Sequence, residues 1–136
     1  MDPERSFLFD TSAFLALRSN EPGADEVEKL LRHGEEGERP LLASFMTRME
    51  LLYLIRREEG EEAARQALRL IDMFNLEWVS CEPEILEAAA ALKAGGGLSA
   101  AGSWIGATAI VRNAILVHKD PEFTKFEHIP QKFLAA

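Results

Sequence analysis

Short apolar segments alternate along this chain with longer segments of helical periodicity. The apolar segments are three or four residues long, as buried parallel strands are, and they cover residues 7–9, 41–44, 76–79 and 115–117. Between them, apolar residues recur three and four positions apart, which is the pattern of amphipathic helices. Strands that are separated by helices lie parallel in one sheet. We therefore predict an α/β fold with a central parallel sheet and helices on both faces.

Residues typical of helix ends support this division. Thr47 and Glu50 match the capping-box pattern, which predicts that a helix begins at Thr47. Ser99 can cap a last long helix that extends to about residue 113. The glycines at 95–97 end the helix before it. Each predicted strand after the first is thus preceded by at least one helix.

The length and hydropathy of the chain suit a small protein of one domain. With 136 residues, it can bury about two-thirds of its unfolded surface in one core, so we expect a single domain over residues 1–136. No apolar run approaches the roughly 20 residues that cross a bilayer. Residues 1–5 lack the basic and then apolar shape of a signal peptide. We expect a cytoplasmic protein without a membrane partner.

The net charge of −8 argues against a protein that binds nucleic acid through a basic surface. Affinity for phosphate normally comes from lysine and arginine, and an excess of acids repels the phosphates. An acidic protein still acts on phosphates when its carboxylates hold divalent cations, because the cations reverse the local charge. The position of the acids therefore matters more than their number.

Three acids follow predicted strands at equivalent points. Asp10 comes directly after the first strand, Glu50 lies early in the helix after the second, and Asp120 follows the last. In an open parallel sheet, ligands bind outside the carboxyl ends of the strands, so all three belong to one edge. Carboxylates that are close together repel unless they are protonated or bind a cation. Oxygen ligands alone suit Mg²⁺ or Mn²⁺ better than zinc.

Each acid also has an ordinary structural interpretation. Asp10 is a good N-cap for the helix that follows it. Glu50 is the capping-box partner of Thr47, and Asp120 precedes Pro121 as turn residues often do. For each acid taken alone, the structural role is enough to explain its presence. Their shared edge is what favours a functional site.

Four segments together resemble the signature segments of PIN-domain proteins, especially VapC-type toxins. They are FLFDTSAFLAL at residues 7–17, TRMELLYLIRR at 47–57, LSAAGSWIGATA at 98–109 and ILVHKDPEF at 115–123. The resemblance covers nearly the whole chain, and the segments occur in the family's order.

The resemblance implies a three-layer α/β/α sandwich and a ribonuclease that needs Mg²⁺ or Mn²⁺ and hydrolyses RNA phosphodiester bonds. It also implies a homodimer, which an apolar excess near Met46, Tyr53 and Phe74 supports, and inhibition by an antitoxin protein. By position, the residues that match the family's cation ligands are Asp10, Glu50, Asp120 and Glu122. Those that match its supporting hydroxyl groups are Thr11 and Ser12.

The chain departs from the family's pattern at Gly102, where an acid is expected. With Ser99 as N-cap, position 102 is the third residue of a helix, where the helix dipole favours a carboxylate. Glycine supplies no ligand, so we expect weak cation binding that tightens in Gly102→Asp. Water can fill the gap, with Glu122 or the Ser103 hydroxyl contributing through it. The alternative is a catalytically inactive PIN-like module that binds RNA or an antitoxin-like protein.

Two basic residues near this edge are predicted to contact RNA. Arg48 and Lys119 flank the acids and are the expected contacts for the RNA backbone.

An unrelated α/β protein with an acidic edge is the third interpretation of the sequence. A haloacid-dehalogenase phosphatase needs a second Asp where Ser12 stands, and a receiver domain needs paired acids before its phosphoacceptor. The sequence contains neither pattern.

Overall fold

A five-stranded parallel sheet forms the centre of the computed structural model, which describes residues 5–35 and 40–134. The strand order is β3-β2-β1-β4-β5, and each neighbouring pair is parallel. The strands are β1 (Phe7–Phe9), β2 (Leu41–Ser44), β3 (Leu76–Val79), β4 (Ile115–His118) and β5 (Gln131–Phe133). The helices are α1 (Thr11–Arg18), α2 (Ala24–Glu35), α3 (Phe45–Glu59), α4 (Glu61–Ile71), α5 (Pro83–Gly95) and α6 (Ala100–Val111), with a 3₁₀ turn, η1 (Pro121–Phe123).

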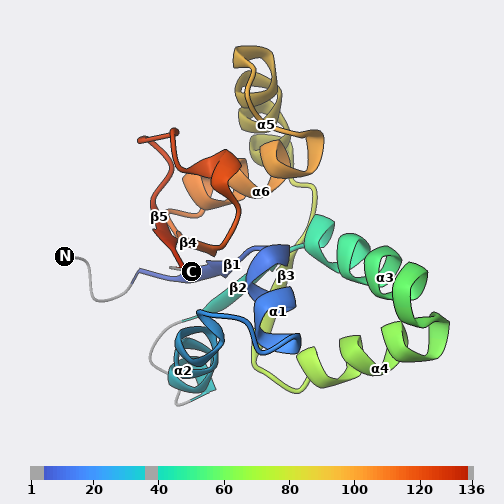
Figure 1. The fold of residues 1–136 in the computed structure, drawn as a ribbon. Helices are drawn as coiled ribbons and strands as arrows, with labels where there is room; N and C mark the ends of the chain where they lie inside the picture. Colours follow the sequence, from blue (N-terminus) through green and yellow to red (C-terminus); the bar gives the residue numbers. More distant parts are fainter. Residues whose placement is uncertain (1–4, 36–39, 135–136) are drawn as a thin grey trace.

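Alternate residues of the strands enter two separate cores. Leu8 is in register with Leu42 and Leu116, and all three pack with residues of α5 and α6. Phe9 and Val117, one position further along, pack instead with residues of α1, α2, α3 and α4. Figure 1 shows α5 and α6 on one side of the sheet and α1 and α2 on the other. The predicted three-layer α/β/α sandwich is confirmed.

The start of α3 differs from the prediction. Ser44 is the N-cap, because its side chain accepts a hydrogen bond of 3.1 Å from Met46 N. The capping box of Thr47 and Glu50 is therefore wrong. Ser44 ends β2 in an extended conformation and already carries a capping hydroxyl, so the N-cap lies three residues earlier than predicted. Thr47 is buried, and Glu50 lies more than one turn into the helix.

Strand β5 has no counterpart among the predicted strands. It is three residues long, and Lys132 and Phe133 are exposed, so it lacks an apolar run. Its place beside β4 comes from pairing with that strand. None of the described helices has the length and apolar character needed to cross a membrane. Residues 1–4, which belong to the segment compared with a signal peptide, lie outside the described part of the chain.

Candidate active site

Asp10 lies at the carboxyl end of β1 and caps α1. Its carboxylate accepts hydrogen bonds from the backbone N–H and the hydroxyl of Ser12, the first of them 3.0 Å long. The side chain is buried, and burial raises the pKa of Asp10 to about 6 against the lowering effect of the Ser12 hydrogen bonds. The charges of Glu50 and Asp120 contribute to the same rise in pKa. Asp10 is therefore both an N-cap and a member of a group of acids.

The predicted acids share one cavity of about 180 Å³. Asp10, Glu50 and Asp120 line it together with Glu122, although these residues come from different parts of the sequence. Thr11, Ser12, Ser99 and Gly102 lie in the same lining. The structure thus brings together the carboxylates that the strand pattern assigned to one edge.

Thr11 joins this edge to α3. Its hydroxyl donates a hydrogen bond of 2.6 Å to Glu50 Oε1, and its Oγ1 lies 3.2 Å from the hydroxyl of Thr47. Thr11 and Thr47 are both buried. Because Thr47 stands one turn before Glu50 on the same helix, the three side chains hold the first turn of α1 against α3.

Ser12 joins the same edge to the loop after β4. Its hydroxyl donates to Asp10 Oδ2 and accepts a hydrogen bond of 2.8 Å from the backbone N–H of Lys119. This single side chain therefore contacts Asp10 and the residue directly before Asp120. Thr11 and Ser12 thus each donate a hydrogen bond to an acid of the cavity.

Asp120 is held by the turn that follows it and by His118. Its carboxylate accepts a hydrogen bond of 3.0 Å from Glu122 N, as the N-cap of η1. His118 Nδ1 accepts from Asp120 N at 3.2 Å, so the ring proton lies on Nε2, 2.8 Å from Gln131 Oε1. Burial lowers the pKa of His118, which favours this neutral form.

Sequence reasoning did not assign His118 a role in positioning the site. The signal that identifies its burial is its spacing from Leu116, since residues two apart in a strand face the same side. The ring is fully buried and packs against Phe123 and Phe133. Its contribution is to fix the backbone of Asp120.

Glu122 extends from η1 to the N-terminus of α6. Its Oε1 accepts a hydrogen bond of 2.7 Å from Ser99 N, and its Oε2 lies 3.2 Å from the Ser99 hydroxyl. Burial raises the pKa of Glu122, and contact with the carboxylate of Asp120 adds to this rise. The hydrogen bonds from Ser99 act in the opposite direction and lower the pKa. This acid is thus the neighbour of Asp120 within the cavity.

Three other predicted residues, Ser103, Lys119 and Arg48, are not in the lining of the cavity. The hydroxyl of Ser103 is buried and donates to Ser99 O at 2.9 Å. Lys119 lies beside Asp120 in the chain, and its Nζ donates to Pro22 O at 2.9 Å. Arg48 is not in the lining of the cavity and forms two hydrogen bonds of 2.8 Å with Asp72. The structure does not bring Arg48 to the acids.

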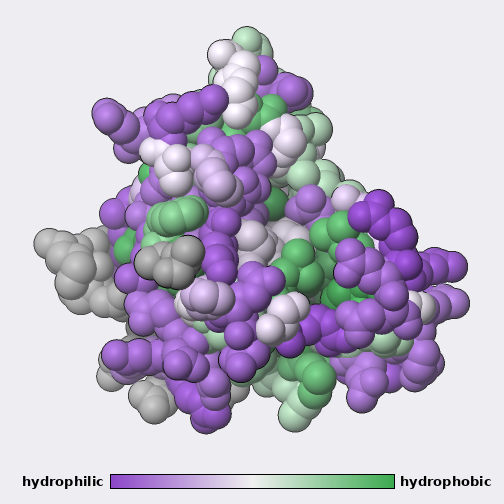
Figure 2. Space-filling model, viewed as in Figure 1, coloured by the Kyte–Doolittle hydropathy of each residue, from purple (hydrophilic) through white to green (hydrophobic). Residues whose placement is uncertain are grey.

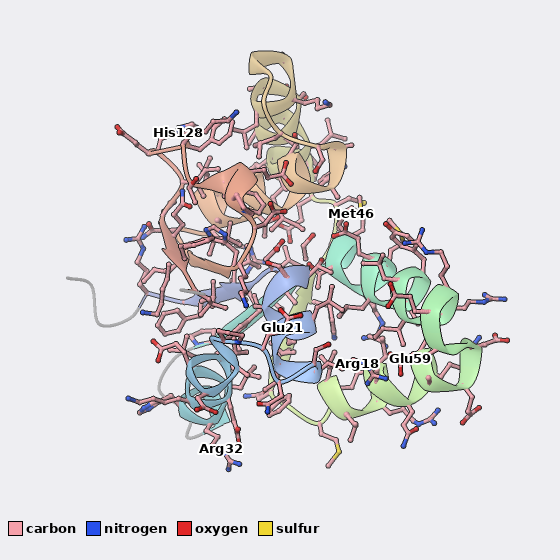
Figure 3. The ribbon with its side chains drawn as sticks, viewed as in Figure 1. Arg18, Glu21, Arg32, Met46, Glu59 and His128 are labelled. Carbon is pink, nitrogen blue, oxygen red and sulfur yellow. The ribbon has the colours of Figure 1, made fainter. Side chains whose placement is uncertain are left out.

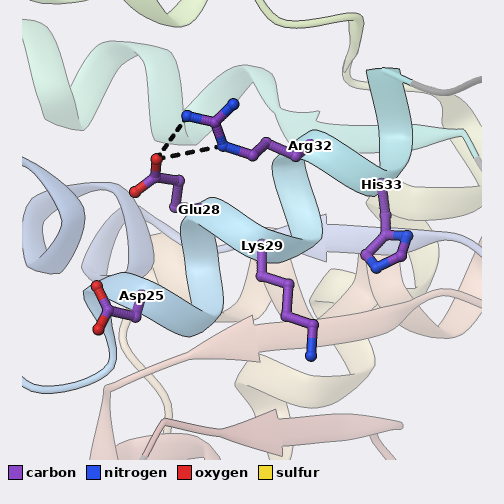
Figure 4. A pocket seen from close by; sticks show the side chains of 5 residues that line it. All are labelled: Asp25, Glu28, Lys29, Arg32 and His33. Carbon is purple, nitrogen blue, oxygen red and sulfur yellow. Dashed lines mark hydrogen bonds and ion pairs between the residues drawn. The ribbon is translucent and has the colours of Figure 1, made fainter.

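A hollow of about 360 Å³ on α2 provides a contrast. It is lined by acidic and basic side chains of this one helix, which Figure 4 shows as Asp25, Glu28, Lys29, Arg32 and His33. Arg32 bonds Glu28 one turn away at 2.8 Å. Opposite charges balance within this hollow, whereas the cavity at the sheet edge contains four carboxylates.

The donors at the sheet edge fit a hard divalent cation in their chemistry. They are all carboxylate oxygens, and their mutual repulsion is relieved when a cation binds. Within residues 5–35 and 40–134, however, no group of three or more His, Cys, Asp and Glu side chains is arranged so that it could hold a metal ion as placed. Hydrogen bonds from Thr11, Ser12 and Ser99 instead engage Glu50, Asp10 and Glu122.

Comparison with known proteins shows the family to which this chain belongs. The model of the PIN domain family matches residues 7–129. Similar solved structures include VapBC2 from Rickettsia felis bound to a DNA fragment from their promoter, with a TM-score of 0.76 and 17% identity over 96% of this chain and 99% of that chain. VapBC-1 from nontypeable Haemophilus influenzae has a TM-score of 0.72 and 22% identity over 95% and 98%.

A third structure, VapC20 from Mycobacterium tuberculosis, is described as a Sarcin-Ricin loop cleaving toxin. Its TM-score is 0.70, with 15% identity over 89% of this chain and 95% of that chain. The comparison with curated proteins finds no match. The solved structures share the fold, and the family model covers the segments that carry the acids. This chain belongs to the PIN domain family.

Proposed function

We propose that this protein is a metal-dependent endoribonuclease of the VapC toxin type, which hydrolyses RNA phosphodiester bonds. The observation that carries the proposal is that Asp10, Glu50 and Asp120, far apart in sequence, line one cavity in a PIN domain. The description of VapC20 as an RNA-loop-cleaving toxin with a similar fold supports it.

In this proposal, Asp10, Glu50 and Asp120 bind Mg²⁺ or Mn²⁺, and Glu122 is a further ligand. The chemistry supplied by such a cation is activation of a water molecule and stabilisation of negative charge on the phosphate. Thr11 and Ser12 orient Glu50 and Asp10 through their hydroxyl groups. The carboxylates act as ligands and the hydroxyl groups act as their supports.

The RNA contacts in this proposal are two basic residues, Lys119 and Arg48. Lys119 precedes Asp120 directly, and we propose that it contacts the RNA backbone. Arg48 is the second proposed contact, and it must first exchange its ion pair with Asp72 for a phosphate. Ser103 takes part only by holding the first turn of α6, through its bond to Ser99 O.

A catalytically inactive module that binds RNA or an antitoxin-like protein is the second candidate function. Gly102, which lies in the lining of the cavity and supplies no side-chain ligand, is the observation that favours it. The two candidates differ in one measurable property. An active enzyme binds the cation and cleaves RNA, whereas the inactive module does neither.

We also propose that a small antitoxin protein binds this chain, as in the VapBC complexes of similar fold. A groove of about 320 Å³ between α1, α3 and α4 offers an apolar surface. Figure 2 shows hydrophobic side chains in this hollow. At its rim, Arg18 of α1 and Glu59 of α3 extend toward one another and pair at 3.0 Å (Figure 3). An exposed apolar groove with a polar rim suits a protein partner.

Two further proposals concern assembly and location. Met49 and Tyr53 on α3 are large apolar side chains and about half exposed, which suits a homodimer contact. A toxin that acts on RNA and is held by a protein partner acts in the cytoplasm.

The test compares Mn²⁺ binding by calorimetry with RNA cleavage in the full chain. The expected result is cleavage that needs the cation, stops with EDTA and is lost in Asp10→Asn. Asp25→Asn is the matched control, because Asp25 is an exposed acid on α2 (Figure 4) and is not in the lining of the cavity. Cleavage that survives both EDTA and Asp10→Asn rules out the mechanism, and absence of both binding and cleavage favours the inactive module.

A further inference from the structure

The first turn of α6 lacks half of an ordinary capping box. Ser99 is the N-cap, and its hydroxyl accepts a hydrogen bond of 2.9 Å from Gly102 N. In a capping box, an acid or amide at the third helical residue accepts in return from the N-cap N–H. Gly102 is that third residue and has no side chain. The Ser99 N–H donates instead to Glu122 Oε1 at 2.7 Å.

Glu122 therefore makes the missing bond from another element. It belongs to η1, 23 residues after Ser99, and its second oxygen lies 3.2 Å from the Ser99 hydroxyl. The helix end is capped reciprocally, as in a capping box, but by two segments that are distant in sequence.

The space at position 102 explains how Glu122 reaches this place. A Cβ atom built on Gly102 would lie 2.9 Å from Glu122 Oε1 and 3.0 Å from both Cδ and Oε2. These separations are below ordinary van der Waals contact. Gly102 is not among the glycines with positive φ, so the backbone conformation does not require glycine there. What a side chain at 102 would meet is the carboxylate of Glu122.

We propose that Gly102 and Glu122 act as a pair, in which Glu122 takes over from η1 the two roles of an acid at position 102. It caps α6 through Ser99, and it adds the fourth carboxylate to the cavity. The first role rests on hydrogen bonds alone, and the second rests on the proposed function. Gly102 is then the residue that admits the fourth acid.

The pairing changes the expected effect of Gly102→Asp. The introduced carboxylate would compete with Glu122 for the same volume and for the same Ser99 N–H. Glu122 has a flexible side chain, so it can move away, and the site then keeps the same number of capping acids. The substitution alone is therefore expected to change little. It is expected to matter once Glu122 is removed.

A double-mutant cycle on the full chain tests the pairing, with Glu122→Ala, Gly102→Asp and the double variant. The readouts are the melting temperature without metal and the Mn²⁺ dissociation constant by calorimetry. Glu122→Ala is expected to lower the melting temperature by about 2–5 °C and to weaken Mn²⁺ binding by about tenfold or more. Gly102→Asp in the Glu122→Ala background is expected to restore both values.

Three control variants separate the two roles. Glu122→Gln keeps an oxygen that accepts from Ser99, so its melting temperature should stay near that of the wild type while Mn²⁺ binding weakens. Gly102→Ala displaces the Glu122 carboxylate without supplying another, so Mn²⁺ binding should weaken although alanine favours helix. Glu127→Ala removes an exposed acid outside the lining of the cavity and should change neither value.

The outcomes distinguish this pairing from the proposed function. If the effects of Glu122→Ala and Gly102→Asp add in both readouts, the pairing is overturned. If Glu122→Ala leaves the melting temperature unchanged, the capping role is wrong. If the wild type binds no Mn²⁺, the cation site and with it the second role of Glu122 fail. The melting temperatures then still decide whether Glu122 and Gly102 are coupled.

Discussion

Thr11 donates a hydrogen bond of 2.6 Å to Glu50 Oε1, while its neighbour Ser12 donates to Asp10. Two consecutive hydroxyl residues at the start of α1 therefore hold two different acids of one cavity. Both donors are neutral, so these hydrogen bonds add no positive charge beside the two acids.

Thr11→Val is expected to destabilise the protein by about 1–2 kcal/mol, because Glu50 and Thr47 lose a buried partner. Mn²⁺ binding should weaken as well, since Glu50 is no longer oriented. Urea unfolding and calorimetry measure the two effects. Thr11→Ser keeps the hydroxyl and serves as the matched control. Equal stability of the two variants would contradict the role given to the hydroxyl.

Ser12→Ala is expected to cost about 1–3 kcal/mol, because the Lys119 N–H loses its acceptor. The same substitution should raise the pKa of Asp10 further, since the Ser12 hydrogen bonds lower it in the wild type. An NMR titration of the Asp10 carboxyl carbon measures this change. A pKa that stays the same or falls would mean that Ser12 does not stabilise the carboxylate.

Asp10 makes the stability of the metal-free protein depend on pH. The pKa of this group is raised from 3.8 to about 6, so the folded state binds its proton more tightly than the unfolded state does. The stabilisation is therefore fully present below pH 3.8 and is lost as the pH rises through about 6. The loss amounts to up to about 3 kcal/mol.

Asp10→Asn should consequently be more stable than the wild type at pH 7.5 in EDTA, because it removes a buried charge. Its advantage should shrink by roughly 1 kcal/mol at pH 5, where the wild-type carboxyl is protonated. Unfolding curves at the two pH values test this expectation, with Asp25→Asn as the control. An advantage that is independent of pH would show that Asp10 does not titrate in this range.

The proposed homodimer depends on exposed apolar side chains of α3. Light scattering of the wild type at micromolar concentration should give the mass of a dimer, and Tyr53→Glu should give that of a monomer. Leu86→Glu is the matched control, because Leu86 on α5 is 47% exposed and Tyr53 is 46% exposed. A monomeric wild type, or dissociation by the control alone, would remove this interface.

Much of the fold and the place of the site follow from the sequence, because hydrophobic periodicity is local. The apolar segments that become β1 to β4 and the helices between them require a parallel sheet. Parallel strands end at one edge, so the residues that follow them meet there. For this reason Asp10, Glu50 and Asp120 could be placed together before their geometry was known.

The contacts that organise the site were decided by tertiary structure. Strand β5 has no apolar run and forms by pairing with β4. The residues of β5 carry no apolar pattern that would indicate this partner.

The relation between Gly102 and Glu122 is the clearest case. From the sequence, Gly102 is a missing acid, and Glu122 is expected to contribute to the gap only through water. In the folded chain, the carboxylate of Glu122 lies where a side chain at 102 would begin, and it bonds the N-cap of the same helix. The sequence determined that an acid was absent from the third position of α6. Only the packing of η1 against α6 decided that another could take its place, because that contact joins residues distant in the chain.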